Sequence, residues 1–430
     1  MKKMADSRAS AKRIALLFLI ILSCSSVQAL AVETPPKMLG QKMIYDQYAH
    51  VVHTNSLLET NIFGPGPLLG ERIIYDPIGK NIYVFGGTNS QNNWVLTNAL
   101  WKYDIEKNVW SLIDTEVKPT PRFDHVMVYM PTLRAILVFG GVTDAERTND
   151  TWLFDIASEK WKKISLDNKP YPRSDPGYCY DEENNIVIIF SGYMEGLQLA
   201  DTWAFDPATK TWIEMKPSGT PLPLNAVSEY GCRMVYDSVN KKVIMFGGHW
   251  KTTGERHGYD NDVWIYDYGM NTWTLRTANP KPSARYTHYM AFDPINAKVV
   301  VFGGHDTSDS IVDDTWTYQY STNKWDEVDN LVKPSNRHAG WMTYVPDLNR
   351  IILYGGGDSE SMSLSDIWSL KVSDYNWDVF NPNESNTAKP SEIPAYPVES
   401  LVLVLILVSI VLFLRARNDG LIIKPRGDIF

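Results

Sequence analysis

Short apolar runs rich in β-branched and aromatic residues recur along the chain at nearly equal intervals. Six of them end at a glycine pair or its equivalent: NIYVF, AILVF, NIVIIF, KVIMF, KVVVF and RIILY. Runs of this length and composition are typical of strands that are buried on both faces. The glycine positions that follow the runs are separated by 54, 51, 56, 56 and 52 residues. This spacing predicts six copies of one structural unit.

A second apolar stretch and a polar turn precede each run: IIYDPIGKN, MVYMPTLRA, YCYDEENN, MVYDSVNKK, MAFDPINAK and MTYVPDLNR. Proline, aspartate and asparagine at these turns favour hairpins. Two tryptophans follow each run, always nine residues apart, as in TWLFDIASEKW from Thr151 to Trp161. Each unit therefore predicts four antiparallel strands.

A four-stranded sheet cannot bury both of its faces alone, but several sheets stacked around an axis can. The pattern therefore predicts an all-β fold, a β-propeller with six blades. The glycine pairs allow close backbone approach, and the tryptophans pack between neighbouring blades. We expect these repeated residues to be structural: Gly86, Gly87, Trp101, Trp110, Gly140, Gly141, Trp152, Trp161, Trp203, Trp212, Gly247, Gly248, Trp264, Trp273, Gly303, Gly304, Trp316, Trp325, Gly355, Gly356, Trp368 and Trp377.

Together with a Pro-Arg linker before several units, these marks resemble the kelch-repeat family. The linker contains Arg122, Arg173, Arg285 and Arg337, and His125 and His288 follow it in PTPRFDH and PSARYTH. We expect the arginines to join neighbouring blades through backbone carbonyls and the histidines to be structural. The first and fourth units depart from the linker, with PLLGER and PLNAVSEYG, and the third has Ser191 in place of a glycine.

The resemblance covers Leu68 to Phe380 and implies a six-bladed kelch β-propeller. The stretch KMIYDQYAHVV near Lys42 leaves a seventh blade open. How the ring closes does not follow from the sequence, because the first and last repeats both look complete.

The two ends of the chain carry apolar segments with different flanks. Residues 1–31 combine a basic start, the run IALLFLIIL and small residues, which is typical of a secretory signal peptide. A lipid-attachment box ending at Cys24 is the alternative. Residues 398–414 contain LVLVLILVSIVLFL, followed by Arg415 and Arg417, which predicts one transmembrane helix with a cytoplasmic tail at 415–430. A buried helix is the alternative for this segment.

Between the ends we expect an N-terminal segment at 32–67, the six repeats at 68–380 and a stalk at 381–397. The predicted localisation is the cell membrane, with a single pass and an extracellular propeller. Of the 430 residues, positions 32–400 hold 32 Lys and Arg against 47 Asp and Glu, a net charge of −15. This charge repels nucleic acid, so we expect no nucleic-acid partner. Cys179 and Cys232 are three positions out of register, which favours buried free thiols over a disulfide.

Strand alternation divides the loops between two faces of the propeller. The turns before each run and the loops between paired tryptophans share one face, which we call the turn face. The loops after the glycine pairs and the Pro-Arg linkers share the other, which we call the loop face. The long, variable loops lie on the loop face, where we expect binding.

Residues that do not repeat are the candidates for function. Trp94 and Trp250 lie in loop-face segments, where they either contact a ligand or cap a blade edge. Trp341 lies in a strand and is expected in the core. The full candidate binding set is Trp94, His249, Trp250, Arg256, His257, His305 and Asp306.

His249 and His305 each follow a glycine pair in adjacent blades. Four aspartates lie close to the second: Asp306, Asp309, Asp313 and Asp314. Imidazoles and carboxylates at one mouth suit a divalent metal, although ordinary polar loop residues give the same pattern. Asp150, Asp201, Asp262, Asp314 and Asp366 stand two residues before a first tryptophan. Their recurrence favours a turn or capping role over catalysis.

No motif for a nucleophile, a phosphate loop or a zinc-binding helix is present in the sequence. Two functions follow. The first is a membrane-anchored extracellular scaffold that binds a protein or a glycan through the loop face and needs no cofactor. The second is a surface carbohydrate-active enzyme of the kelch type, with a metal at His249 and His305 as one version; this rests on analogy of fold alone.

Overall fold

The computed structural model describes residues 64–195, 199–219, 221, 226–252, 257–308, 310–360 and 362–380. All of them belong to one compact unit of the chain. The predicted signal peptide, the stretch near Lys42, the stalk, the transmembrane segment and the tail lie outside these ranges. Among the described residues, no helix is both long and apolar enough to span a membrane.

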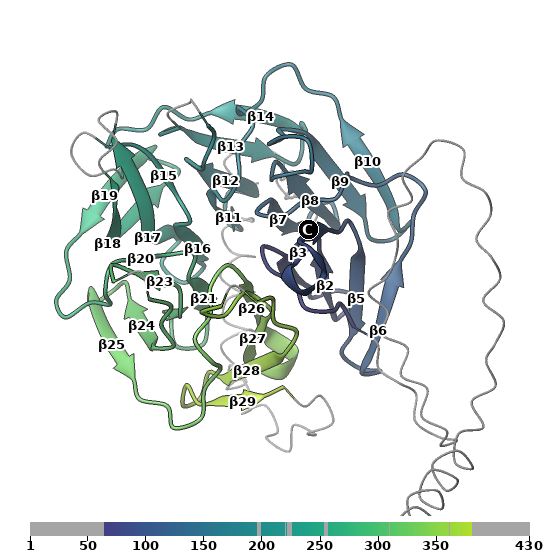
Figure 1. Ribbon diagram of the computed structural model, residues 1–430. Coiled ribbons are helices and arrows are strands. Elements are labelled where there is room, and N and C mark those ends of the chain that lie inside the picture. Colours follow the sequence, from purple (N-terminus) through teal and green to yellow (C-terminus); the bar gives the residue numbers. More distant parts are fainter. Residues whose placement is uncertain are drawn as a thin grey trace, which may run out of the picture. The chain divides into compact units, whose positions relative to one another are not determined.

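Six antiparallel sheets surround a common axis, with the first strand of each nearest the axis and the fourth at the rim (Figure 1). Blade 1 contains β1 (Arg72–Asp76), β2 (Asn81–Phe85), β5 (Leu100–Asp104) and β6 (Val109–Ile113); blade 2 contains β7 (Val126–Met130), β8 (Ala135–Phe139), β9 (Thr151–Asp155) and β10 (Lys160–Ile164); blade 3 contains β11 (Gly177–Asp181), β12 (Ile186–Phe190), β13 (Thr202–Asp206) and β14 (Thr211–Glu214). Blade 4 contains β16 (Arg233–Asp237), β17 (Lys242–Thr252), β18 (His257–Asp267) and β19 (Thr272–Arg276); blade 5 contains β21 (Tyr289–Asp293), β22 (Lys298–Phe302), β24 (Thr315–Gln319) and β25 (Lys324–Val328); blade 6 contains β26 (Trp341–Val345), β27 (Arg350–Tyr354), β28 (Ile367–Lys371) and β29 (Trp377–Val379).

The remaining elements lie outside these sets of four strands, and one of them, β15, pairs with the extension of β17 as a fifth strand of the blade 4 sheet. They are β3 (Thr88–Asn89), the 3-10 turn η1 (Ser90–Asn92), β4 (Val95–Leu96), β15 (Ala226–Tyr230), β20 (Arg285–Tyr286), β23 (His305–Asp306) and the 3-10 turn η2 (Pro346–Leu348). The predicted all-β fold, with four strands in each of six repeats, is therefore confirmed.

The second tryptophan of each pair packs against the blade before it, as the repeat predicts. The Trp161 ring lies 5.2 Å from the Phe85 ring of blade 1, and the Trp377 ring lies 5.1 Å from the Phe302 ring of blade 5. Three of these indoles also donate a hydrogen bond across the interface to a threonine hydroxyl, as Trp377 does to Thr315 at 2.9 Å. The blades are thus joined by buried aromatic contacts that recur around the ring.

The first and last blades meet directly, which settles how the ring closes in the described part of the chain. Leu68 N–H donates to the Leu364 carbonyl at 3.0 Å, and Gly356 N–H donates to the Leu68 carbonyl at 3.0 Å. The Trp110 ring of blade 1 lies 6.3 Å from the Tyr354 ring of blade 6. Each blade keeps its own four strands, so closure exchanges no strand between the first and last repeats.

A ring of backbone hydrogen bonds surrounds the axis just before the inner strands begin. One residue from each blade donates its N–H to the carbonyl of the equivalent residue in the preceding blade, at 2.7–3.0 Å. All six residues have a positive φ, between 48° and 72°. We call this ring the collar; its members are Gly70, Asp124, Asp175, Gly231, Thr287 and Ala339.

The linker arginines are fully buried, and each forms a bidentate ion pair with the repeated aspartate of its own blade. Arg285 donates to both Asp314 oxygens at 2.6 and 2.7 Å and to the Gly303 carbonyl at 3.0 Å, and the Asp314 carboxylate also accepts the Trp316 indole N–H. The expectation that the side chains bridge blades is corrected. The arginine side chain binds groups of its own blade, and the arginine carbonyl accepts a hydrogen bond from the preceding blade. For example, Gly304 N–H of blade 5 donates to the Arg337 carbonyl at the start of blade 6, at 2.9 Å.

The loop-face segment that contains Trp250 was expected as a long loop, but its described residues, 249–252 and 257–262, continue the strands of blade 4. Strands β17 and β18 are 11 residues each, and Trp250 pairs with Gly258 across them. The polar composition of this segment had indicated a loop. Cys179 and Cys232 are buried and form no disulfide in the described part of the chain, so the preference for thiols over a disulfide is confirmed.

Candidate functional site

The residue before the collar pairs in every blade with a residue just after the glycine pair, which forms a layer on the loop face. The pairs are Leu69 with Thr88, Phe123 with Val142, Ser174 with Tyr193, Tyr230 with His249, Tyr286 with His305 and His338 with Gly357. The backbone pairing repeats, but the side chains do not. Blades 1 and 2 supply apolar residues and a threonine, whereas tyrosine and histidine dominate in blades 3 to 6.

The tyrosine and histidine rings of this layer contact one another in a continuous row. Tyr230 lies 4.7 Å from His249, and Tyr259 stacks on Tyr286 at 4.9 Å between ring centroids. Tyr286 in turn stacks on His305 at 5.2 Å. All these rings are partly exposed. We call the row the mouth cluster; it comprises Tyr193, Tyr230, His249, Tyr259, Tyr286, His305 and His338.

Burial keeps two imidazoles of the mouth cluster, those of His249 and His338, uncharged. It lowers the pKa of His249 to about 4, and the neighbouring His257 ring lowers it further. The pKa of His338 falls to about 3, again because of burial and then because of His305, whose ring centroid lies 4.4 Å away. His249 Nε2 and His257 Nδ1 are 3.2 Å apart, so a hydrogen bond joins the two rings. At neutral pH, His249 and His338 therefore add hydrogen-bonding groups to this aromatic surface without adding charge.

Several predicted residues lie in or beside this cluster. His249 and His305 are both members, joined through Tyr286, and His257 is exposed next to His249. Asp306 follows His305, and its carboxylate accepts N–H groups of Ser308 and Ser310, which stabilises the turn. Arg256 falls outside the described residues.

Trp250 and Trp94 do not join the cluster. The Trp250 ring packs over Gly258, where a Cβ would lie 2.6 Å from it. Trp94 is 51% exposed and lies on the β3–β4 hairpin of blade 1. Trp341 is buried, as expected.

Sequence reasoning missed Tyr230, Tyr259, Tyr286 and His338. The sequence did contain a signal for three of them. Tyr230, Tyr286 and His338 stand directly before a collar residue, at a position where the six repeats differ. Among the described residues there is no group of three or more histidine, cysteine, aspartate or glutamate side chains that could hold a metal ion. The hypothesis of a carbohydrate-active enzyme with a metal at His249 and His305 thus finds no support in this part of the chain.

Beneath the mouth cluster, charged side chains lie close to the propeller axis. The guanidinium groups of Arg72 and Arg233 lie 4.9 and 4.8 Å from the Trp341 ring centroid, and both pair with Asp175, at 3.1 and 2.9 Å. Asp124 lies 3.5 Å from Arg72, and its pKa is raised by burial and by the Asp175 carboxylate. Since the arginines already have carboxylate partners, this network joins the inner strands to one another.

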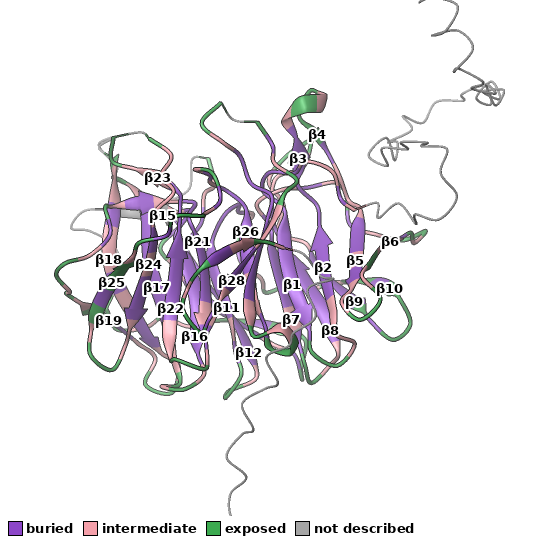
Figure 2. Cartoon of the chain, turned by 90° about the horizontal axis from the view of Figure 1, so that it is seen from below, coloured by how far each residue is buried: buried purple, intermediate pink, exposed green. Residues whose placement is uncertain are grey.

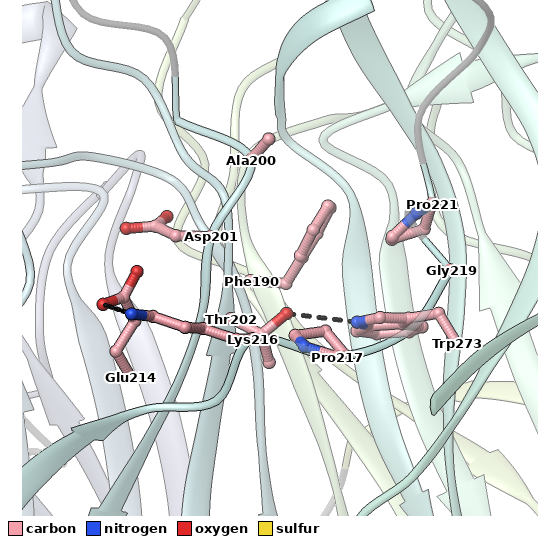
Figure 3. Close-up of a pocket in the computed structure, with 10 residues that line it drawn as sticks. All are labelled: Phe190, Ala200, Asp201, Thr202, Glu214, Lys216, Pro217, Gly219, Pro221 and Trp273. Carbon is pink, nitrogen blue, oxygen red and sulfur yellow. Dashed lines mark hydrogen bonds and ion pairs between the residues drawn. The ribbon is translucent and has the colours of Figure 1, made fainter. Parts of the chain in front are cut away.

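The described part of the propeller contains two cavities of similar volume. One, of about 340 Å³, lies on the axis and is lined by residues of all six inner strands, including Met127, Met234, Met290 and Met342. The other, of about 350 Å³, lies between blades 3 and 4, where Thr202 accepts the Trp273 indole N–H at 3.1 Å (Figure 3). Equivalent residues of all six blades line the axial cavity, so it belongs to the scaffold, whereas Lys216, Pro217 and Gly219 of the linker before blade 4 line part of the second. The mouth cluster is the candidate binding site.

Comparison with known proteins agrees with the fold. Residues 82–305, just over half of the chain, match the family model of the Attractin/LZTR1 β-propeller, and residues 224–404 match that of the KLHDC2/KLHL20/DRC7 kelch-repeats domain. The chain therefore belongs to the kelch-repeat β-propeller family. Propellers of this family generally bind proteins, which defines the class as a binding scaffold.

Curated relatives share the repeats at low identity. The chain is 21% identical over 345 residues to Mei4-dependent protein 6 of Schizosaccharomyces pombe, covering 71% of this chain and 48% of that protein. It is 24% identical over 270 residues to Multiple epidermal growth factor-like domains protein 8 of Mus musculus, covering 60% of this chain and 9% of that protein. It is also 24% identical over 292 residues to Kelch domain-containing protein 10 of Xenopus tropicalis, covering 64% and 68%. The chain thus spans about half or less of the first two relatives.

Proposed function

We propose that this chain is a membrane-anchored propeller that binds a protein ligand outside the cell through the mouth cluster. The observation that carries the proposal is the break in repeat symmetry, since four blades place contacting tyrosine and histidine rings at positions where the other two have apolar residues and a threonine. Tyrosine is enriched among interface residues that dominate binding energy, because it buries a large ring and loses little conformational entropy.

The chemistry of the cluster favours a protein over an ion or a phosphorylated ligand. The His249 and His338 imidazoles are neutral, and stacking holds the Tyr259 and Tyr286 rings against each other. Uncharged aromatic surface with hydrogen-bonding edges resembles the centre of a protein interface more than an anion site. The membrane part of the proposal rests on the apolar segments at 1–31 and 398–414 and on the arginines that follow the second.

Binding is tested with the full chain on arrays of cell-surface proteins and of glycans. For each protein that binds, we expect Tyr286→Ala to weaken affinity at least tenfold, which corresponds to about 1.4 kcal/mol. Met270→Ala, a 73% exposed position in a loop between paired tryptophans on the turn face, is the control and should leave affinity unchanged. Unchanged binding by Tyr286→Ala, or binding to glycans alone, would contradict the proposal.

Topology is tested separately on intact cells. A membrane-impermeant amine reagent should label exposed propeller lysines such as Lys107, whereas an antibody should reach a C-terminal tag only after permeabilisation. Labelling of the tag in intact cells, or no labelling of the propeller, would contradict the predicted orientation.

A further inference from the structure

The hairpin formed by β3 and β4 in blade 1 places a tryptophan on a backbone that disfavours it. Asn93 and Trp94 are consecutive residues with positive φ, 52° and 59°. Asparagine tolerates this left-handed region, but a bulky side chain is rare there and glycine is preferred. A sequence selected only to make this turn would place glycine at position 94.

Hydrogen bonds to the last blade hold this strained turn in place. Ser90 N–H donates to the Ser363 hydroxyl at 3.0 Å, and Ser363 N–H donates to the Ser90 hydroxyl at 2.7 Å. Within the hairpin, Trp94 N–H donates to the Asn89 carbonyl at 3.0 Å, and the Asn89 side chain accepts Gln91 N–H at 2.8 Å. The turn is therefore fixed at the junction of the first and last blades, on the loop face (Figure 2).

The indole that this turn carries is not needed to cover a core. Trp94 is 51% exposed. Val95 and Met362, which are neighbours in sequence of the residues that join the two blades, are 39% and 37% exposed. By contrast, the second tryptophans of blades 2 to 6 are at most 6% exposed. Residues 88–98 contain no charged side chain. The hairpin tip is thus a raised, uncharged apolar point with amide and hydroxyl groups around it.

We propose that Trp94 is an anchor that inserts into an apolar pocket of a protein ligand, as a second contact beside the mouth cluster. This inference rests on the proposed function. A protein is favoured because a single tryptophan on a raised hairpin needs a pocket on its partner, and protein interfaces centre on such residues. An anionic polymer or an anionic lipid surface is disfavoured, because the tip has no cation to pair with it.

The first test measures stability and needs no ligand. We compare the melting temperature of the full chain with that of Trp94→Gly, and use Trp250→Gly as the matched control, because Trp250 packs on Gly258 in an ordinary strand. Trp94→Gly should leave the melting temperature unchanged or raise it, whereas Trp250→Gly should lower it. A fall of more than about 4 °C for Trp94→Gly would show that the indole serves the fold and would overturn the inference.

The second test measures binding to the proteins that an array of cell-surface proteins identifies for the unmodified chain. Trp94→Gly should weaken at least one of these complexes tenfold or more. If Tyr286→Ala weakens binding and Trp94→Gly does not, the anchor is refuted and the proposed function stands. If neither variant has an effect, or if no protein on the array binds, both are refuted. An effect of Trp94→Gly on glycan binding alone would overturn the assignment to a protein pocket.

Discussion

Glu71 is a carboxyl group buried between blades 1 and 6, and its replacement by glutamine should change the pH dependence of stability. The side chain is 0% exposed, and neither carboxyl oxygen has a hydrogen-bond partner among the described residues. Burial raises its pKa from 4.5 to about 8, although its own backbone N–H and then the adjacent Arg72 oppose the shift. Folding therefore takes up a proton at neutral pH, because the native state holds Glu71 protonated and the unfolded chain does not.

The size of the effect follows from this difference in pKa. A raised carboxyl pKa gives stability that is complete below about pH 4.5 and is lost as the pH rises towards 8. One proton corresponds to about 1.4 kcal/mol per pH unit, so a shift of this size corresponds to at most about 5 kcal/mol over the whole range. Glutamine resembles the protonated acid and does not titrate. Glu71→Gln should thus match the unmodified chain near pH 5 and exceed it in stability near pH 8.

Urea denaturation of both chains at pH 5, 6, 7 and 8 measures this difference. Comparing the two chains removes the contributions of other groups, including His125 and His288, whose pKa values burial lowers well below the ordinary range and whose effect has the opposite sign. We expect the free energy of unfolding of Glu71→Gln, relative to the unmodified chain, to rise with pH. A difference that stays constant, or a variant that is less stable at pH 8, would refute the reasoning.

Three further predictions concern the scaffold. Trp377→Phe should cost about 1 kcal/mol more than Trp325→Phe, because the Trp377 indole donates to a threonine hydroxyl and the Trp325 indole N–H has no partner in the described residues; equal losses in urea denaturation would contradict this. Ala339→Gly should stabilise the chain by about 0.5–1 kcal/mol, since φ there is 55° and glycine already occupies two equivalent collar positions; a lower melting temperature would contradict it. The two buried cysteines should not react with a thiol reagent until the chain unfolds, because burial raises the thiol pKa of Cys179 well above its ordinary value; rapid labelling of the native chain would show that the thiols are accessible.

The repeat carried nearly all the information about the scaffold. Six tryptophan pairs and six glycine positions predicted the blade number, the four strands of each blade and the packing of the second tryptophans, because each of these depends on residues that recur. The collar was not predictable in this way. It is made of backbone hydrogen bonds at six positions that share a left-handed conformation, and their side chains range from glycine to aspartate.

The sequence identified only some members of the mouth cluster, which is the candidate binding site. His249 and His305 were found because each follows a glycine pair, but Tyr230 and Tyr286 were not, since the sequence alone does not show that they pair with those histidines. The strand extension in blade 4 was missed because residues 249–252 and 257–262 have the polar composition of a loop. The pairing of Trp250 with Gly258 shows instead two strands that continue past the glycine pair.

The central claim is that repeated residues build the propeller and that residues breaking the repeat bind the ligand. It is tested most directly by measuring ligand affinity and melting temperature together for Tyr286→Ala and Trp377→Phe. We predict that Tyr286→Ala loses affinity at least tenfold with little change in melting temperature, and that Trp377→Phe melts at a lower temperature but binds with unchanged affinity while folded. The opposite pattern, with affinity lost at Trp377 and retained at Tyr286, would contradict the account.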